Sequence, residues 1–153
     1  MKIYIGTDHA GYEMKEAIAS YVEKELGYTV ADMGAHQFDD QDDYPDFIQL
    51  VAKEVSHDPA GARGIVLGGS GQGEAMVCNR FPNVRSAVFY GGNQDIVKLS
   101  REHNNANVLA LGARFMSLDE AKAATKLWLE TQFLDEERHV RRLKKIEQIW
   151  PYR

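Results

Sequence analysis

Short apolar segments alternate with longer segments of helical periodicity along this chain of 153 residues, and no other feature restricts its fold as much. We expect the apolar segments to be strands, because of their length and the turn residues at their ends. A chain that alternates strands with helices favours a mostly parallel, doubly wound α/β sheet with helices on both faces. The five predicted strands span residues 2–6, 29–33, 64–68, 85–90 and 107–112.

The intervening segments place apolar residues three and four positions apart, as amphipathic helices do. Local signals mark several helix ends. Gly27 suits a C-terminal cap, and Pro45 suits a first helical turn. Ser117 and Glu120 form a capping box, and Pro151 follows the expected end of the last helix. The predicted helices span residues 11–26, 45–55, 117–132 and 135–148, with another that begins near residue 73.

Length and composition indicate one domain, residues 1–153. No apolar run reaches the 18 or so residues of a membrane span, so no membrane partner is expected. Met1 leads directly into the first strand without the features of a signal peptide, which predicts a cytoplasmic protein. A single cysteine, Cys78, agrees with a reducing compartment. The net charge of −5 argues against a nucleic-acid partner, despite the basic residues 138–145.

Polar residues follow several of the predicted strands. Asp8 and His9 come after the first strand, residues 68–73 after the third, residues 90–93 after the fourth and Arg114 after the fifth. Ligands of open parallel sheets bind at the carboxyl ends of the strands. We therefore expect these residues to border one crevice.

A glycine-rich loop follows the third strand. Gly69, Gly71 and Gly73 alternate in it, so its backbone N–H groups are unobstructed and suit an oxygen anion. The loop is not a P-loop, because no Lys-Ser/Thr pair follows. It is not a dinucleotide motif either, because Glu74 occupies the third glycine position. The alternative is a plain strand-to-helix turn in which Glu74 complements the helix dipole.

Glu74 beside this loop also suits a chemical role. A carboxylate can remove a proton from carbon while the loop amides and the Ser70 hydroxyl stabilise the oxyanion that forms. Proton abstraction next to a carbonyl requires this combination. The helix N-terminus would lower the pKa of Glu74 and burial would raise it, and the sequence leaves this balance open.

His103 and Asn104 precede the fifth predicted strand, whereas Arg114 follows it. The two ends of a strand lie at opposite edges of a sheet, so His103 cannot reach the glycine-rich loop of its own chain. If His103 takes part in the chemistry there, a second copy must supply it, which predicts a homodimer with shared active sites. Otherwise His103 and Asn104 are an ordinary pair at the end of a helix.

Arg138 and Arg142 lie four residues apart on the last predicted helix, on a different face from its apolar residues. Adjacent like charges are unfavourable unless an anion lies between them, and guanidinium groups suit the oxygens of a phosphate. A solvated basic helix is the alternative. The five histidines and one cysteine show no spacing typical of metal ligands, so no metal is expected.

Five segments in consistent order cover much of the chain: GTDHAGYEMK at 6–15, DYPDF at 43–47, GIVLGGSGQGEA at 64–75, REHNNANVLALGAR at 101–114 and RHVRR at 138–142. Together they resemble the ribose-5-phosphate isomerase type B family, which also includes galactose-6-phosphate isomerase subunits. The resemblance implies a Rossmann-like α/β/α fold, dimers or tetramers, and no metal or other cofactor. It also implies isomerisation of an aldose phosphate to a ketose phosphate through an enediolate.

The resemblance further implies roles for individual residues, which contact the sugar, form an anion hole or bind phosphate. The sugar contacts are Asp8, His9, Tyr44, Gln72 and Asn104, with His9 near the ring oxygen or the phosphate. The anion hole is formed by Gly69, Ser70, Gly71, Gln72 and Gly73. The phosphate ligands are Arg114, Arg138 and Arg142, some of them on a C-terminal helix that reaches a partner subunit.

One position departs from many members of that family. They carry a cysteine base where this chain has Gly68, whereas a second branch uses the glutamate that matches Glu74. The resemblance therefore implies Glu74 as the general base and His103 as the acid or base of ring opening. The expected reaction converts ribose 5-phosphate to ribulose 5-phosphate. A four-carbon or six-carbon sugar phosphate, or a noncatalytic sugar-phosphate binding subunit, are the alternatives.

Overall fold

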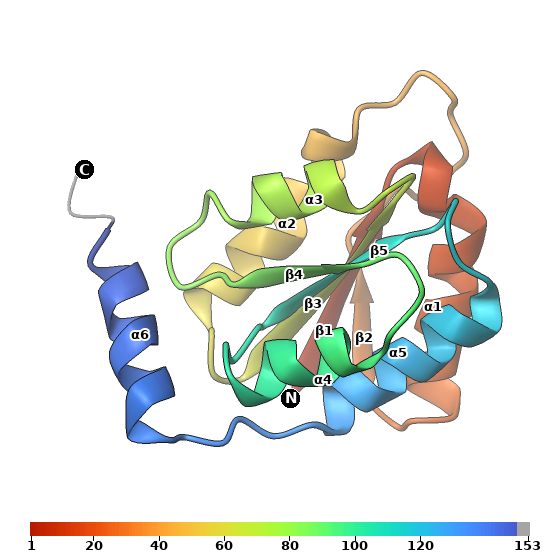
Figure 1. Ribbon diagram of the computed structural model, residues 1–153. Helices are drawn as coiled ribbons and strands as arrows, with labels where there is room; N and C mark the ends of the chain where they lie inside the picture. The colour runs from red at the N-terminus through yellow and green to blue at the C-terminus, as the bar shows by residue number, and fades with distance from the viewer. Residues whose placement is uncertain (150–153) are drawn as a thin grey trace.

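The computed structural model describes residues 1–149, and its centre is one five-stranded sheet (Figure 1). The strands follow the order β2-β1-β3-β5-β4, and neighbouring strands are parallel. This arrangement confirms the α/β sheet that the alternating pattern predicts. The strands are β1 (Lys2–Thr7), β2 (Thr29–Asp32), β3 (Ala62–Gly68), β4 (Ser86–Phe89) and β5 (Val108–Gly112).

Helices connect the strands, and most lie close to the predicted bounds. Helix α4 ends beside His103 and Asn104, in agreement with the alternative that this pair closes a helix, although no bounds for the helix are predicted from the sequence. Pro151, expected to follow the last helix, lies outside the described residues. Across residues 1–149, no helix has both the length and the apolar character that a membrane crossing requires. The helices are α1 (Tyr12–Lys24), α2 (Tyr44–His57), α3 (Gln72–Cys78), α4 (Asp95–Glu102), α5 (Leu118–Glu130) and α6 (Glu137–Glu147), with a 3-10 turn at His9–Gly11.

Helices cover both faces of the sheet, α2 and α3 on one face and α1, α4 and α5 on the other (Figure 1). Successive strand residues point to opposite faces. Large side chains such as Ile65 and Leu111 meet α1 and α5, whereas Val66 and Ala110 face α2 and α3. On the face covered by α2 and α3, Gly64 has no side chain, and a Cβ there would lie 2.8 Å from Val51 of α2. Small residues therefore let α2 lie close against the sheet.

Two predicted helix ends are present. The Ser117 hydroxyl accepts from the Glu120 N–H at 3.2 Å, and the Glu120 carboxylate accepts from the Ser117 N–H at 2.8 Å. Gly27 has a φ of 75°, the left-handed conformation expected just beyond a helix. The capping box fixes the start of α5, and so helps to set where the loop after β5 ends.

Lys15 is a buried cation that holds the chain where it leaves β2. Its ammonium group lies 2.5 Å from Asp32 and donates to the Ala35 carbonyl at 2.9 Å, and its side chain is fully buried. These contacts fasten the start of the loop at residues 36–43 to α1. The far end of that loop leads into α2, at the carboxyl edge of the sheet.

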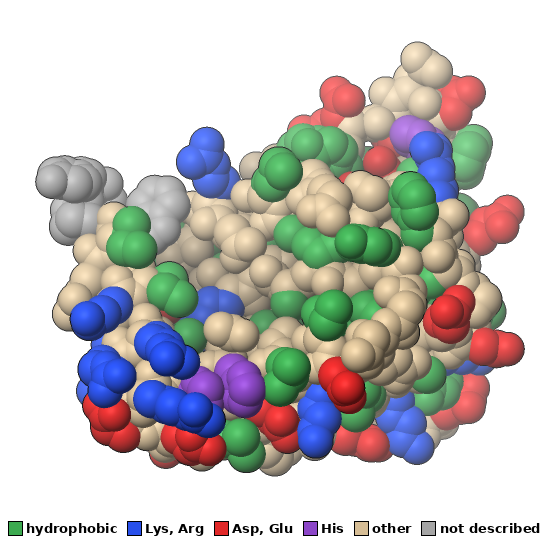
Figure 2. Space-filling model, in the orientation of Figure 1, with side chains coloured by type: hydrophobic (Ala, Val, Ile, Leu, Met, Phe, Trp, Pro, Cys, Tyr) green, Lys and Arg blue, Asp and Glu red, His purple; other side chains and the backbone are tan. Residues whose placement is uncertain are grey.

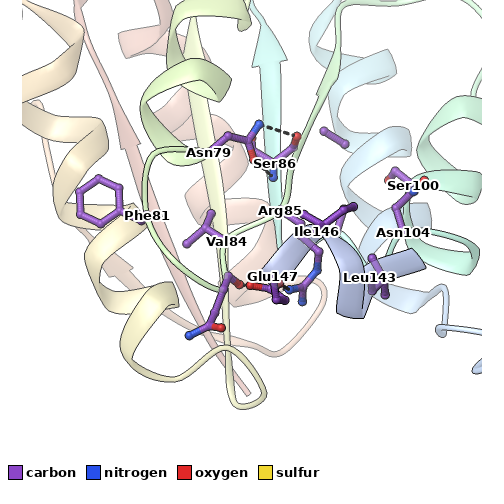
Figure 3. Close-up of a pocket in the computed structure, with 13 residues that line it drawn as sticks. Asn79, Phe81, Val84, Arg85, Ser86, Ser100, Asn104, Leu143, Ile146 and Glu147 are labelled. Carbon is purple, nitrogen blue, oxygen red and sulfur yellow. Dashed lines mark hydrogen bonds and ion pairs between the residues drawn. The ribbon is translucent and has the colours of Figure 1, made fainter. Parts of the chain in front are cut away.

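Helix α6 stands apart from the layers, beyond an extended segment that follows α5 (Figure 1). An ion pair of 2.9 Å joins its Glu147 to Arg85. Leu143 and Ile146 line a cavity of about 380 Å³ between α6 and the body of the chain (Figure 3). Ile146 is nonetheless 46% exposed, so its own chain covers the apolar side of α6 only in part. The predicted contact of α6 with a partner subunit stays a prediction.

We expect Ser117→Ala to destabilise the protein by about 1 kcal/mol, the usual cost of losing an N-cap side chain. For a chain of this size that corresponds to a thermal midpoint about 2–4 °C lower. Ser117→Asp is the matched control, because aspartate also caps helices well, and it should restore most of the loss. Thermal unfolding of the three proteins measures the effect, and equal midpoints for all three would contradict it.

Candidate active site

Several predicted site residues meet at the carboxyl edge of the sheet. The Arg114 side chain lies over Gly69, where a Cβ would be 3.5–3.6 Å from its atoms, and the Arg114 N–H donates to the Gly69 carbonyl at 3.1 Å. Tyr44, at the start of α2, packs on Gly73, where a Cβ would be 2.8 Å from the Tyr44 hydroxyl. Asp8 and His9 follow β1 at the same edge. The glycine-rich loop thus lies between side chains from three other segments.

The backbone of this loop is shaped to present N–H groups. Gly71 has a φ of 76° and lies so close to β5 that a Cβ would be 3.1 Å from the Leu111 carbonyl carbon. Among residues 1–149, the N–H groups of Gly69, Ser70 and Gly71 donate to no acceptor. The Ser70 hydroxyl faces the same turn and accepts weakly from the Gln72 N–H at 3.4 Å. Free amides beside a hydroxyl at the start of α3 form a site suited to an oxygen anion.

Glu74, in the first turn of α3, points inward and is only 4% exposed. Its carboxyl group occupies the space beside the Gly68 Cα, so a Cβ at residue 68 would overlap it. Burial raises the pKa of Glu74, and the nearby Asp8 carboxylate adds to this, whereas a hydrogen bond to its own backbone N–H lowers it. The net pKa is raised, so burial outweighs the hydrogen bond from the backbone N–H of Glu74. A carboxyl group of this kind can accept a proton nearer to neutral pH.

Cys78 lies one helical turn beyond Glu74 and is fully buried. Burial and the Glu74 carboxylate raise the pKa of its thiol to about 12. A thiol that stays protonated is a poor nucleophile and a poor base. Glu74 is therefore the ionisable group beside the loop that suits proton transfer.

His9 has a partner that the sequence analysis did not single out. Its ring Nδ1 lies 2.7 Å from the Asp42 carboxylate, which comes from the loop before α2. Possible ligand atoms of Asp8, His9 and Asp42 lie within 4.8 Å of one another, the one such group of His, Cys, Asp and Glu side chains among residues 1–149. Hydrogen bonds to His9 already occupy one Asp42 oxygen, which favours an ion pair over metal ligation. The expectation of no metal stays a prediction.

The remaining predicted site residues lie elsewhere. The His103 ring stacks on His139, with centroids 4.3 Å apart and an angle of 12° between the planes. His139 lies on α6 beside Arg138 and is only 3% exposed. Burial lowers the pKa of His139, and the nearby His103, Arg138 and Arg142 lower it further. Figure 2 shows Lys and Arg side chains gathered over α6, with histidine beside them.

This second group lies at the amino edge of the sheet, where β5 begins. Strand β5 has five residues, which span about 16 Å at 3.3 Å per residue. Asn104 is also at this edge, where it lines the cavity next to α6 (Figure 3). One chain therefore holds two separate groups of candidate residues. Glu74, Ser70, Asp8, His9 and Arg114 form one, and His103, Asn104, Arg138 and Arg142 belong to the other.

Comparisons with known proteins give a consistent result. The ribose/galactose isomerase family model matches residues 3–146. Ribose-5-phosphate isomerase B of Mycobacterium tuberculosis is 40% identical over 143 residues, which cover 94% of this chain and 86% of that relative. The solved structure of the Clostridium thermocellum ribose-5-phosphate isomerase B has a TM-score of 0.89 at 43% identity, covering 97% of both chains.

A second solved structure is ribose-5-phosphate isomerase B of Mycoplasma genitalium with bound ribulose-5-phosphate. It has a TM-score of 0.91 at 34% identity, covering 97% of this chain and 95% of the other. The agreement over nearly the full length of both structures confirms the Rossmann-like fold that the resemblance implies.

We expect Gly68→Ala to move the Glu74 carboxyl group out of its buried position, because the new methyl group would overlap it. The pKa of Glu74 should then fall toward the ordinary value for glutamate, since burial is the main cause of its rise. A crystal structure and a carboxyl NMR titration measure both effects. Gly69→Ala is the control, because a Cβ there meets Arg114 at an ordinary 3.5 Å and leaves Glu74 in place. An unmoved carboxyl group in Gly68→Ala would refute the steric argument.

Proposed function

The chain belongs to the ribose/galactose isomerase family, and we propose that it interconverts ribose 5-phosphate and ribulose 5-phosphate through an enediolate. The observation that carries this proposal is the buried Glu74 carboxyl group, which lies next to three N–H groups without acceptors among residues 1–149. Aldose–ketose isomerisation needs a base at carbon and a stabilised oxyanion beside it. The relative from Mycoplasma genitalium, solved with ribulose-5-phosphate, supports the choice of a five-carbon substrate.

In the proposed mechanism, Glu74 removes the proton from C2 of the open-chain aldose and returns it to C1, while the C2 hydroxyl group loses its proton and the C1 oxygen gains one. Negative charge gathers on the substrate oxygens as the enediolate forms, and the amides of Gly69 and Gly71 and the hydroxyl of Ser70 stabilise it. The raised pKa of Glu74 suits this role, because a base is most effective when its pKa lies near the working pH. Asp8, Tyr44 and Gln72 contact the sugar hydroxyl groups around this centre.

The second group of residues belongs, in this proposal, to the active site of a partner copy. His103 opens the sugar ring, Asn104 binds the sugar, and Arg138 and Arg142 bind phosphate together with Arg114 of the first copy. A homodimer with shared sites follows, because the two groups lie at opposite edges of one sheet. Dimers that pair further into tetramers are compatible with this arrangement.

Exposed apolar side chains support a contact between copies. Strand β4 is an edge strand, and among residues 1–149 it pairs only with β5. Large apolar side chains near it are exposed, and Figure 2 shows hydrophobic side chains on the same face as the basic α6. A contact that covered this face would also bring α6 of one copy toward another copy. The exposed residues are Met76, Tyr90, Ile96, Leu99 and Phe115.

The proposal treats residues 1–153 as one sugar-phosphate isomerase domain of a cytoplasmic enzyme, without metal, other cofactor or nucleic-acid partner. The family match over residues 3–146 and the single sheet support one domain. The negative net charge of −5 disfavours nucleic acid.

Proton NMR in deuterated water, with four-, five- and six-carbon aldose phosphates, tests the reaction and the substrate together. Ribose 5-phosphate should exchange its C2 proton fastest and yield ribulose 5-phosphate. In the same assay Glu74→Gln should lose about 10²- to 10⁴-fold in turnover, the scale of a general base. Glu23→Gln, an exposed glutamate on α1, is the control. Faster exchange with another chain length would reassign the substrate, and exchange with none would indicate a binding protein.

Mixing two inactive variants tests the shared sites. In a Glu74→Gln and His103→Asn heterodimer, one site would carry both changes and the other would be intact. Refolding an equal mixture should therefore restore about a quarter of wild-type activity, since half the dimers are mixed and each has one intact site. Each variant refolded alone is the control. A mixture no more active than its components would show that the two groups do not share a site.

A further inference from the structure

His9 is held by a carboxylate from a neighbouring loop. One oxygen of Asp42 accepts from the His9 backbone N–H at 3.0 Å and lies 2.7 Å from ring Nδ1. The Asp42 side chain is 8% exposed, whereas the His9 side chain is 26% exposed. With Nδ1 engaged, the ring nitrogen left for a ligand is Nε2. The two contacts with Asp42 therefore fix the position of the imidazole and determine which ring nitrogen can bind a ligand.

Holding His9 with a buried carboxylate costs more free energy than holding it with a neutral side chain. The second Asp42 oxygen is buried and has no hydrogen-bond partner among residues 1–149. An asparagine could accept the same two hydrogen bonds through its amide oxygen. Burying a carboxylate with an unsatisfied oxygen costs more than burying a neutral amide. An asparagine amide would be enough to hold the His9 ring in this position. We therefore infer that the negative charge of Asp42 has a function of its own.

Four charged groups face or border His9. Asp8 comes from the end of β1, Asp42 from the loop before α2, and Arg114 from the segment after β5. Glu13 of α1 lines the same cavity of about 330 Å³ as His9. The hydrogen bond to Asp42 is the largest cause of a raised His9 pKa, and Asp8 adds to it, whereas burial and Arg114 lower it. The net pKa is raised, so the imidazolium persists to higher pH than in an ordinary histidine.

We propose that Asp42 is a positioning residue that keeps His9 in its imidazolium form, so that His9 and Arg114 together present two positive charges to the phosphate of the substrate. This inference rests on the proposed sugar-phosphate function. Two neighbouring cations repel each other in the empty site, and a phosphate dianion between them relieves that repulsion. Asp42 supplies the compensating charge while the site is empty.

The proposal predicts a pH-dependent defect in Asp42→Asn. Well below the His9 pKa of both proteins, the imidazole is charged in each and their KM values should agree. As pH rises, the variant loses its imidazolium first, so its KM should rise relative to wild type. The ratio should reach about 10-fold for each unit by which the pKa falls. The kcat should change little, because His9 contributes to binding in the ground state and the transition state alike.

The experiment combines two measurements on the intact protein. Imidazole NMR titration without substrate gives the pKa of His9, assigned with a His9→Gln variant among the five histidines. Steady-state kinetics with ribose 5-phosphate from pH 5.5 to 8.5 gives KM and kcat separately. Asp42→Glu keeps the charge and should retain a raised His9 pKa. Asp40→Asn removes the same charge from an exposed position of the same loop, where the carboxylate accepts a hydrogen bond from Gln41, and should match wild type.

A His9 pKa that falls by about one unit in Asp42→Asn, with a KM defect confined to higher pH, supports the proposal. An unchanged pKa, or a KM defect independent of pH, overturns it. A wild-type His9 pKa at or below the ordinary value of about 6.5 also overturns it, and that measurement needs no variant to fold. Absence of wild-type activity on ribose 5-phosphate would instead contradict the proposed function, while the titration would still test the Asp42–His9 pair.

Discussion

The shared direction of the five strands determines which side chains of this protein can meet. Because every pairing is parallel, β1, β3 and β5 all deliver their carboxyl ends to one edge, and the loops there bring Asp8, Glu74 and Arg114 together. The same geometry sends His103 to the opposite edge, where it stacks on His139. A reaction that needs Glu74 and His103 at one substrate is therefore incompatible with a single copy of this fold, and the proposed sharing of active sites between copies rests on this geometry.

Within the first group, two glycines perform different tasks. Gly71 adopts a left-handed conformation against β5, which turns the chain so that neighbouring N–H groups are left free. Gly68 has an ordinary conformation but leaves empty the space that the Glu74 carboxyl group fills. Burial there raises the pKa of Glu74, although the carboxyl group belongs to the first turn of a helix. A carboxyl group of raised pKa and a set of unobstructed donors thus arise from the same seven-residue stretch.

The sequence was sufficient to predict the elements that have a clear hydrophobic period or a capping signal, such as the five strands, α1, and α5 with its capping box. It left the bounds of α4 unpredicted, because the one signal considered there was the pair that ends the helix, His103 and Asn104. It also missed Asp42 as the partner of His9, because the two residues are 33 positions apart and Asp42 is one of four aspartates in residues 39–43. The balance of effects on Glu74 was likewise out of reach, since it depends on burial by other segments. Residues whose partners come from distant loops have no local signature.

The acidic loop at residues 36–43 holds Asp42 beside His9, although the two residues are 33 positions apart in the sequence. Four aspartates in five residues repel one another, and a free loop of this composition would extend into solvent. Its start is fastened by Lys15, which binds Asp32 and the Ala35 carbonyl, and its end enters α2 through Tyr44, which packs on Gly73. Phe38 also meets the His9 ring edge-on, with centroids 6.3 Å apart. With both ends tied to the walls of the site, the loop offers its one buried carboxylate to His9, and the charge of the imidazole becomes coupled to the loop's position.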